Sequence, residues 1–131
     1  MKSFETSFRV RYSETDRMGY VYYSRYAEYF EVARVEMLRS MGISYRDLED
    51  SGIILPVVTY SIRFSKPAYY DDLIRVKVSV KCPLKASITF LYESYNEKNE
   101  LLNEAQVTLA FIDRTTGKPV RAPAAVAEKF Y

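Results

Sequence analysis

The sequence predicts an α+β domain in which one long helix packs on a curved antiparallel sheet. Two observations predict this fold class: residues 22–41 repeat apolar side chains at helical spacing, and most other segments alternate as strands do. The strands after the helix follow one another through short turns, which favours antiparallel pairing. With 131 residues, the chain has the length of a single domain, residues 1–131.

The first predicted strand covers residues 4–12, where apolar and polar side chains alternate apart from Thr6. Residues 13–21 break this alternation, and Asp16 and Gly19 are typical of a loop. Together they predict a strand followed by a loop that leads into the long helix.

The long helix has an apolar stripe with clear ends. Its members are Tyr22, Tyr26, Tyr29, Phe30, Ala33, Met37 and Met41. Ser24 is a suitable N-cap, and Gly42 is a suitable residue just beyond the C-terminus. A short second helix is predicted over residues 44–51, ended by Gly52.

The remaining segments read as strands and turns. Pro56 predicts a kink or a free edge near the start of the predicted strand 53–64. Asp71 and Asp72 are expected to form a turn before the predicted strand 73–81. The predicted strands are 53–64, 73–81, 87–95 and 100–113, with a hairpin turn at 96–99 and a terminal helix at 122–131.

The composition excludes several kinds of catalytic site. The chain has no His and one Cys, so Ser-His-Asp triads, Cys-His dyads and a structural zinc site are ruled out. Cys82 has no partner for an intrachain disulfide, which fits a reducing compartment, and we interpret it as a structural thiol. Catalysis is left to carboxylates, Tyr, Lys, hydroxyls or backbone amides, and we expect neither a metal nor an organic cofactor.

The charge pattern argues against nucleic acid and membrane partners. There are 19 Lys and Arg against 17 Asp and Glu, a net charge of +2, with no basic run. The first residues lack an apolar signal core, and no stretch approaches ~18 apolar residues. We therefore expect a cytoplasmic protein without a stable membrane anchor.

The loop before the long helix is where chemistry is most plausible. Asp16 lies just before Gly19 and the start of the helix, where exposed backbone N–H groups and the positive end of the helix dipole meet. A carbonyl group held by those N–H groups would be open to attack by Asp16 or by a water that Asp16 activates. The plainer alternative is that Asp16 and Glu14 are solvated loop acids.

Residues 12–39 read YSETDRMGYVYYSRYAEYFEVARVEMLR, with Lys66-Pro67-Ala68 and matching segments at 71–73, 101–105 and 118–119 further on. In this order they resemble the acyl-CoA thioesterases of the hotdog fold, in the 4-hydroxybenzoyl-CoA and YbgC-type group. The resemblance covers nearly the whole chain.

This resemblance implies a hotdog fold and hydrolysis of an acyl-CoA to a carboxylate and free CoA. It also implies a homodimer or homotetramer with the active site at the subunit interface. The family's catalytic acid falls on Asp16, as nucleophile or general base, and the backbone N–H that polarises the thioester carbonyl falls on Tyr23. Members of the YbgC-type branch commonly carry His where this chain has Tyr23, and a tyrosine hydroxyl is a poor base at neutral pH.

Substrate contacts are expected at three places. Gly19 belongs to the catalytic loop. The turn that carries Lys81, Lys85 and Ser87 is where the family contacts the CoA phosphates, and Lys85 is the best candidate. The third set is Val58, Thr59 and Tyr60. These residues either line the pantetheine channel or belong to the core or the dimer interface.

Three other readings stay open. An acyl-carrier-protein thioesterase would need a basic docking face, and a non-catalytic acyl-CoA-binding hotdog protein would fit the Tyr23 departure. A hotdog dehydratase is disfavoured, because its acid/base pair usually includes His. Glu31 is an alternative catalytic acid, but an ion pair with Arg34, three residues later, is the simpler expectation.

Overall fold

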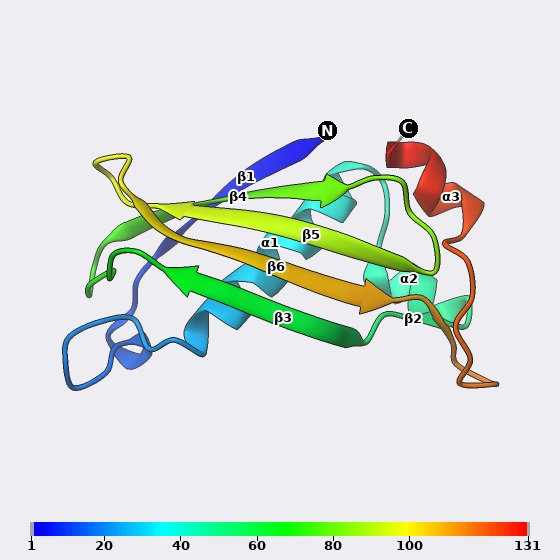
Figure 1. Cartoon of the computed structure of the whole chain (residues 1–131), viewed down its shortest axis with the longest axis horizontal. Helices are drawn as coiled ribbons and strands as arrows, with labels where there is room; N and C mark the ends of the chain where they lie inside the picture. The colour runs from blue at the N-terminus through cyan, green and yellow to red at the C-terminus, as the bar shows by residue number, and fades with distance from the viewer. Residues whose placement is uncertain (1, 131) are drawn as a thin grey trace.

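A five-stranded antiparallel sheet carries one long helix on one face in the computed structural model, which describes residues 2–130. The strands lie in the order β1-β4-β5-β6-β3, so β1 (Ser3–Arg9) and β3 (Val57–Phe64) are its two edges. The central strands are β4 (Leu73–Lys81), β5 (Ser87–Tyr95) and β6 (Leu101–Ala110). Helix α1 (Arg25–Ser40) lies behind the sheet in Figure 1. The predicted α+β arrangement is confirmed.

Strands β4 and β5 have the predicted bounds because their alternation is regular. Every second side chain of β4 points into the core and is fully buried, from Ile74 to Val80. The opposite side chains lie on the outer face, which is polar. This period of two fixes the register, since a shift by one residue would expose the whole apolar set.

A row of aromatic rings joins α1 to the sheet. Phe30 of α1 stacks on Tyr92 of β5 with ring centroids 4.4 Å apart. The ring of Tyr26 lies 6.1 Å from that of Phe30 and 5.8 Å from that of Phe64, at the end of β3. We call Phe64, Tyr26, Phe30 and Tyr92 the aromatic row. Ring pairs in such geometries add roughly 0.5–1.5 kcal/mol each beyond their buried area, so the row fixes α1 on the sheet.

The two ends of α1 are closed differently. Ser24 takes the N-cap position, as predicted, but its side chain caps no backbone N–H. At the other end, Gly42 has φ +81° and its N–H donates to Arg39 O at 2.9 Å, while the Ile43 N–H donates to Leu38 O at 2.9 Å. This pair of bonds is a Schellman ending. The last carbonyls of α1 are thus satisfied, whereas its first turn has no side-chain cap.

The short helix α2 (Tyr45–Asp50) begins at Ser44, whose hydroxyl accepts the Asp47 N–H. The predicted strand 53–64 is wrong in one respect, since it divides at Pro56 into β2 (Ile53–Ile54) and β3. The predicted strand 100–113 likewise divides into β6 and β7 (Ile112–Asp113). The reason is that β2 and β7 pair with each other as a separate two-stranded sheet.

Two further boundaries differ from the prediction. Strand β1 ends at Arg9 rather than at residue 12, and Tyr12–Glu14 form a 3-10 helix instead. The C-terminal helix is short, with α3 (Ala124–Ala127) followed by a 3-10 turn over Glu128–Phe130. The last residue of the predicted helix, 131, lies outside the described residues. No helix within 2–130 has the length and apolar character needed to cross a membrane.

Candidate active site

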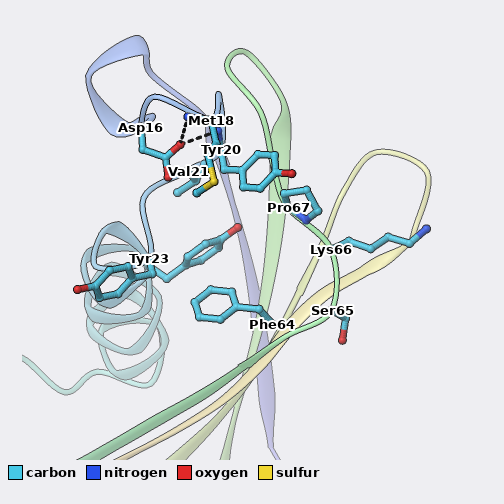
Figure 2. Close-up of a pocket in the computed structure, with 10 residues that line it drawn as sticks. Asp16, Met18, Tyr20, Val21, Tyr23, Phe64, Ser65, Lys66 and Pro67 are labelled. Carbon is cyan, nitrogen blue, oxygen red and sulfur yellow. Dashed lines mark hydrogen bonds between the residues drawn. The ribbon is translucent and has the colours of Figure 1, made fainter.

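A cavity of about 270 Å³ opens where the loop before α1 meets the end of β3. The loop contributes Asp16, Met18 and Tyr20 to its wall, and the opposite wall begins at Phe64. Figure 2 shows these groups facing one another, while the Lys66 side chain extends away from the cavity. The amino group of Lys66 instead contacts the Glu100 carboxylate. The cavity therefore has one acid, Asp16, on a largely apolar wall.

The Asp16 carboxylate is held by one of its two oxygens. Its Oδ1 accepts the Met18 N–H at 2.9 Å and the Tyr20 N–H at 3.2 Å, the dashed lines of Figure 2. The Asp16 N–H donates to Tyr20 O at 2.8 Å, and the Gly19 N–H donates to Asp16 O at 2.9 Å. Within residues 2–130, Oδ2 accepts no hydrogen bond. One oxygen is fixed and the other is left for chemistry.

Gly19 makes the turn that produces this geometry. Its φ is +84°, a left-handed conformation that side-chain-bearing residues adopt only with strain. Its N–H is occupied by Asp16 O, and it is not part of the cavity wall. Its place in the structure is therefore that of a turn residue that shapes the loop around Asp16.

Tyr23 lies two residues before the first residue of α1 and is one of the residues that line the cavity. The preceding N–H, of Tyr22, donates to Glu14 O at 2.8 Å. The Tyr23 N–H itself donates to no acceptor among the residues that the structure describes. A free N–H at the positive end of a helix dipole is suited to an oxygen that gains negative charge.

The side chain of Tyr23 is 61% exposed, and its ring packs on that of Tyr22 with centroids 4.6 Å apart. A hydrogen bond with Tyr23, together with the nearby Asp16 carboxylate, raises the pKa of Tyr22 above its ordinary value. The Tyr22 hydroxyl therefore stays protonated at neutral pH. At that pH the Tyr22 hydroxyl can donate a hydrogen bond but cannot act as a base.

The other predicted contact residues lie outside this cavity. Tyr60 lines a second cavity, of about 260 Å³, between α1 and β3. Val58 occupies an irregularity in the pairing of β3 with β6, and Thr59 follows it on the outer face. Lys85 and Ser87 lie at the β4–β5 turn, at the opposite end of the sheet from the Asp16 loop (Figure 1). A single chain brings Asp16 and Tyr23 together but not the others.

The expected ion pair between Glu31 and Arg34 is not formed, and that prediction is wrong. The Arg34 side chain is buried instead, and its Nε donates to the Tyr45 hydroxyl at 3.2 Å. Glu31 faces the second cavity from the surface of α1. Helical spacing alone did not reveal that Arg34 lies on the buried side, where α2 supplies its partner.

The turn predicted at Asp71 and Asp72 is confirmed. Asp71 has φ +69°, and Asp72 Oδ2 accepts the Tyr69 N–H at 2.9 Å. Cys82 is unpaired, and its Sγ donates to the Phe130 carbonyl at 3.4 Å. Within the described part of the chain, no three His, Cys, Asp or Glu side chains are grouped as metal ligands.

Two contributors to this region were missed from the sequence. Phe64 reads only as a strand residue, yet it forms the wall opposite Asp16. Glu14 reads as a solvated loop acid, yet its side chain is almost fully buried. The strand alternation of residues 57–64 contained a signal for Phe64, because it places that ring on the face that meets α1. No local pattern reveals the partner of Glu14, which lies 15 residues away on α1.

Comparison with known proteins gives a consistent result. Residues 10–130 match the family model of the thioesterase-like superfamily. The putative acyl-CoA thioesterase YneP of Bacillus subtilis is 32% identical over 86% of this chain and 81% of its own length. The acyl-CoA thioester hydrolase YbgC of Escherichia coli is 31% identical over 97% of this chain and 95% of its own length.

Solved structures agree with these relatives. The crystal structure of a DHNA-CoA thioesterase from Staphylococcus aureus is 37% identical to this chain, with a TM-score of 0.88. The match covers 92% of this chain and 81% of the staphylococcal one.

Proposed function

Because this chain belongs to the thioesterase-like superfamily, has the hotdog fold and is an acyl-CoA thioester hydrolase, we propose that Asp16 and the Tyr23 N–H carry its chemistry. The observation that carries the proposal is their common cavity. Both residues line it, one oxygen of the Asp16 carboxylate accepts no hydrogen bond within residues 2–130, and the Tyr23 N–H donates none there. A thioester carbonyl between them would meet the acid on one side and the donor on the other.

In the proposed reaction, the carbonyl oxygen accepts the Tyr23 N–H and gains negative charge as the carbon is attacked. If Asp16 is a general base, its Oδ2 takes a proton from water as the oxygen of that water bonds to the carbonyl carbon. The C–S bond then breaks, and the proton passes from Asp16 to the departing CoA sulfur. If Asp16 is the nucleophile, Oδ2 bonds to the carbon, CoA thiolate leaves, and water hydrolyses the resulting anhydride. In both routes the products are a carboxylic acid and free CoA, and one oxyanion donor is worth about 3 kcal/mol.

The donor is preorganised by the fold rather than by a side chain. The Schellman ending closes the C-terminus of α1, while the uncapped N-terminus leaves the dipole of a 16-residue helix directed at the cavity. The exposed Tyr23 side chain is not needed for this contact, because the donor is its backbone N–H. We infer that a Tyr at this position leaves carbonyl polarisation intact and removes any proton transfer that a His would supply.

We propose that two copies of the chain complete the site through β3. This edge strand has unpaired backbone groups on one side and exposes Val57, Val58, Tyr60 and Phe64, a surface typical of a covered edge. Antiparallel pairing of β3 with its copy would join the two sheets. Lys85 and Ser87 are then proposed to reach the CoA phosphates of a substrate bound mainly to the other copy, in a homodimer or a homotetramer. The cytoplasm stays the expected location.

The test is hydrolysis of short, long and aromatic acyl-CoAs by the wild type and by Asp16→Asn. Asparagine keeps the oxygen that accepts the Met18 and Tyr20 N–H groups, so the variant removes only the charge and the reactive oxygen. We expect kcat to fall by about 10²- to 10⁴-fold. Thiol release is followed with a blank for Cys82, which is exposed. The matched control is Asp50→Asn, an exposed Asp at the end of α2, which should keep the wild-type rate.

The outcomes separate the alternatives. Thiol release at the uncatalysed background rate in both wild type and Asp16→Asn, with acyl-CoA still bound, would identify a binding protein instead. Hydrolysis of acyl carrier protein thioesters alone, again abolished by Asp16→Asn, would keep the mechanism and change the substrate carrier. The acyl group preferred within the panel then defines the substrate class.

A further inference from the structure

Glu14 is the most completely bonded acid near the cavity, although it does not line it. Its side chain is only 2% exposed, and both carboxylate oxygens are occupied. Oε1 accepts the Arg11 N–H at 2.8 Å and the Tyr29 hydroxyl at 2.8 Å, and Oε2 accepts the Arg11 guanidinium at 3.1 Å. The carboxylate therefore ties the end of β1 to the buried face of α1.

The backbone of Glu14 continues this connection toward the catalytic groups. Its carbonyl accepts the Tyr22 N–H at 2.8 Å, and Thr15 and Val21 form the next bridge. The Asp16 N–H then donates to Tyr20 O, so residues 14–22 form a closed hairpin. Asp16 lies two residues after Glu14 in one arm, and Tyr23 directly follows the other arm.

We propose that Glu14 is the positioning residue that sets the Asp16 carboxylate and the Tyr23 N–H at their working separation. The inference rests on the proposed function of that pair, and adds a device that holds it. Glu14 anchors the hairpin to α1, and the proposed oxyanion donor, the Tyr23 N–H, lies between the hairpin and the first turn of α1. A shift of the hairpin relative to α1 would thus move the acid away from the donor.

The bonding of Glu14 fits an ionised anchor. Burial acts to raise its pKa, but the hydrogen bonds from the Arg11 N–H, the Tyr29 hydroxyl and the Arg11 guanidinium outweigh it and lower the pKa. Burial and the bond to Glu14 raise the pKa of Tyr29, which keeps its hydroxyl a donor. Charge-assisted bonds of this kind are about twice as strong as neutral ones.

The test compares Glu14→Ala, Glu14→Gln and Tyr29→Phe. A misplacement of about 1 Å costs up to ~100-fold in rate, so we expect Glu14→Ala to lower kcat by about 10- to 100-fold with KM within about threefold. Glutamine keeps an acceptor for the Arg11 N–H and Tyr29 hydroxyl and should recover most of the rate. Tyr29→Phe removes one bond while leaving the ring stacked on Phe8, and should have an intermediate effect. Glu128→Ala, at the opposite end of the molecule, is the control (Figure 1).

Two further measurements distinguish positioning from simple loss of structure. Glu14→Ala added to Asp16→Asn should cause no further loss of rate, because its effect acts through Asp16. Hydrogen exchange at the Tyr20 and Tyr22 amides should accelerate in Glu14→Ala but not in Asp16→Asn, with thermal unfolding showing both proteins folded.

Several results would overturn the inference. These are an unchanged kcat in folded Glu14→Ala, a loss of rate equal to the unfolded fraction, or unchanged exchange at the two amides. If the wild type and Asp16→Asn hydrolyse nothing, the proposed function fails, and the exchange measurement still decides the positioning role by itself.

Discussion

The two ends of the sheet hold different parts of the proposed site and are built in different ways. At one end, the loop around Asp16 is held by side-chain bonds to backbone N–H groups and by the buried Glu14. At the other, the β4–β5 turn presents an exposed Lys85, and the main chain there is tied to the C-terminal segment through the Ala122 N–H to Lys85 O bond of 2.7 Å. The end with the Asp16 loop, where the thioester bond is proposed to break, is thus held by more hydrogen bonds to side chains. The β4–β5 turn supplies the positive charge of Lys85.

This contrast also supports the proposal that two copies of the chain complete the site. The two ends of a nine-residue strand such as β4 are separated by nearly its full length of roughly 30 Å. The proposed route to a complete site is a second copy paired along β3. The largest effect should therefore come from breaking that pairing.

Val58→Lys is expected to separate the proposed dimer. Val58 is 55% exposed on the edge strand, so the folded chain tolerates the change, but pairing would bury an unpartnered charge at a cost of about 3–5 kcal/mol. Dimer affinity should fall by about 100-fold or more, and activity should fall with it. Sedimentation and activity are measured over the same concentrations.

Ser7→Lys is the control for this prediction, since it places the same charge at an exposed position of β1, the other edge. It should stay assembled and active. A fully active Val58→Lys monomer would contradict the idea that two copies complete the site.

A smaller effect is expected at the far end of the sheet. Lys85→Ala should raise KM for an acyl-CoA about fivefold with kcat unchanged, as for loss of one exposed ion pair to phosphate. A substrate lacking the 3′-phosphate should show a smaller difference between the two proteins if Lys85 contacts that group. Lys98→Ala, at the Asp16 end, serves as the matched control. An equal rise in KM for both lysine variants would indicate a general charge effect instead.

The smallest effect concerns pH and stability at the Asp16 end. The pKa of Glu14 is lowered in the folded chain, so its contribution is present above the unfolded pKa of about 4.3 and is lost as pH falls through the folded value. The free energy of unfolding of the wild type should exceed that of Glu14→Gln by about 1–2 kcal/mol near pH 7. This difference should shrink below about pH 4. Thermal unfolding from pH 7 to pH 3 measures this. A constant difference would show that the Glu14 charge does not contribute.

Much of the fold was predictable because it depends on local periodicity. The bounds of β4 and β5, the presence of a short helix after Gly42 and the Gly42 ending follow from patterns of a few residues. The division of strands at Pro56 and at residue 111 was not predictable, because it depends on β2 and β7 finding each other far along the chain. Pro56 alone indicated only a kink or a free edge.

The residues of the candidate site likewise differ in whether a local sequence pattern indicates them. Asp16 was proposed from the order of a strand, an acid, a glycine and a helix start, and the Tyr23 N–H was proposed from the resemblance. Glu14 was not, because its burial depends on the Tyr29 hydroxyl, and the side of α1 that carries that group becomes clear only once the helix lies on the sheet. Arg34 was misread for the same reason.

The aromatic row has a consequence for how this chain can change its substrate. Tyr26, Phe30 and Tyr92 are at most 2% exposed, whereas Phe64 at the cavity wall is 48% exposed. Close packing makes any exchange of the three inner rings costly to the whole domain. Among the four rings, a smaller side chain is therefore cheapest at Phe64, where it would enlarge the proposed acyl site at the cost of one ring contact with Tyr26. In evolutionary terms, the row confines change among its four rings to the one that is not buried.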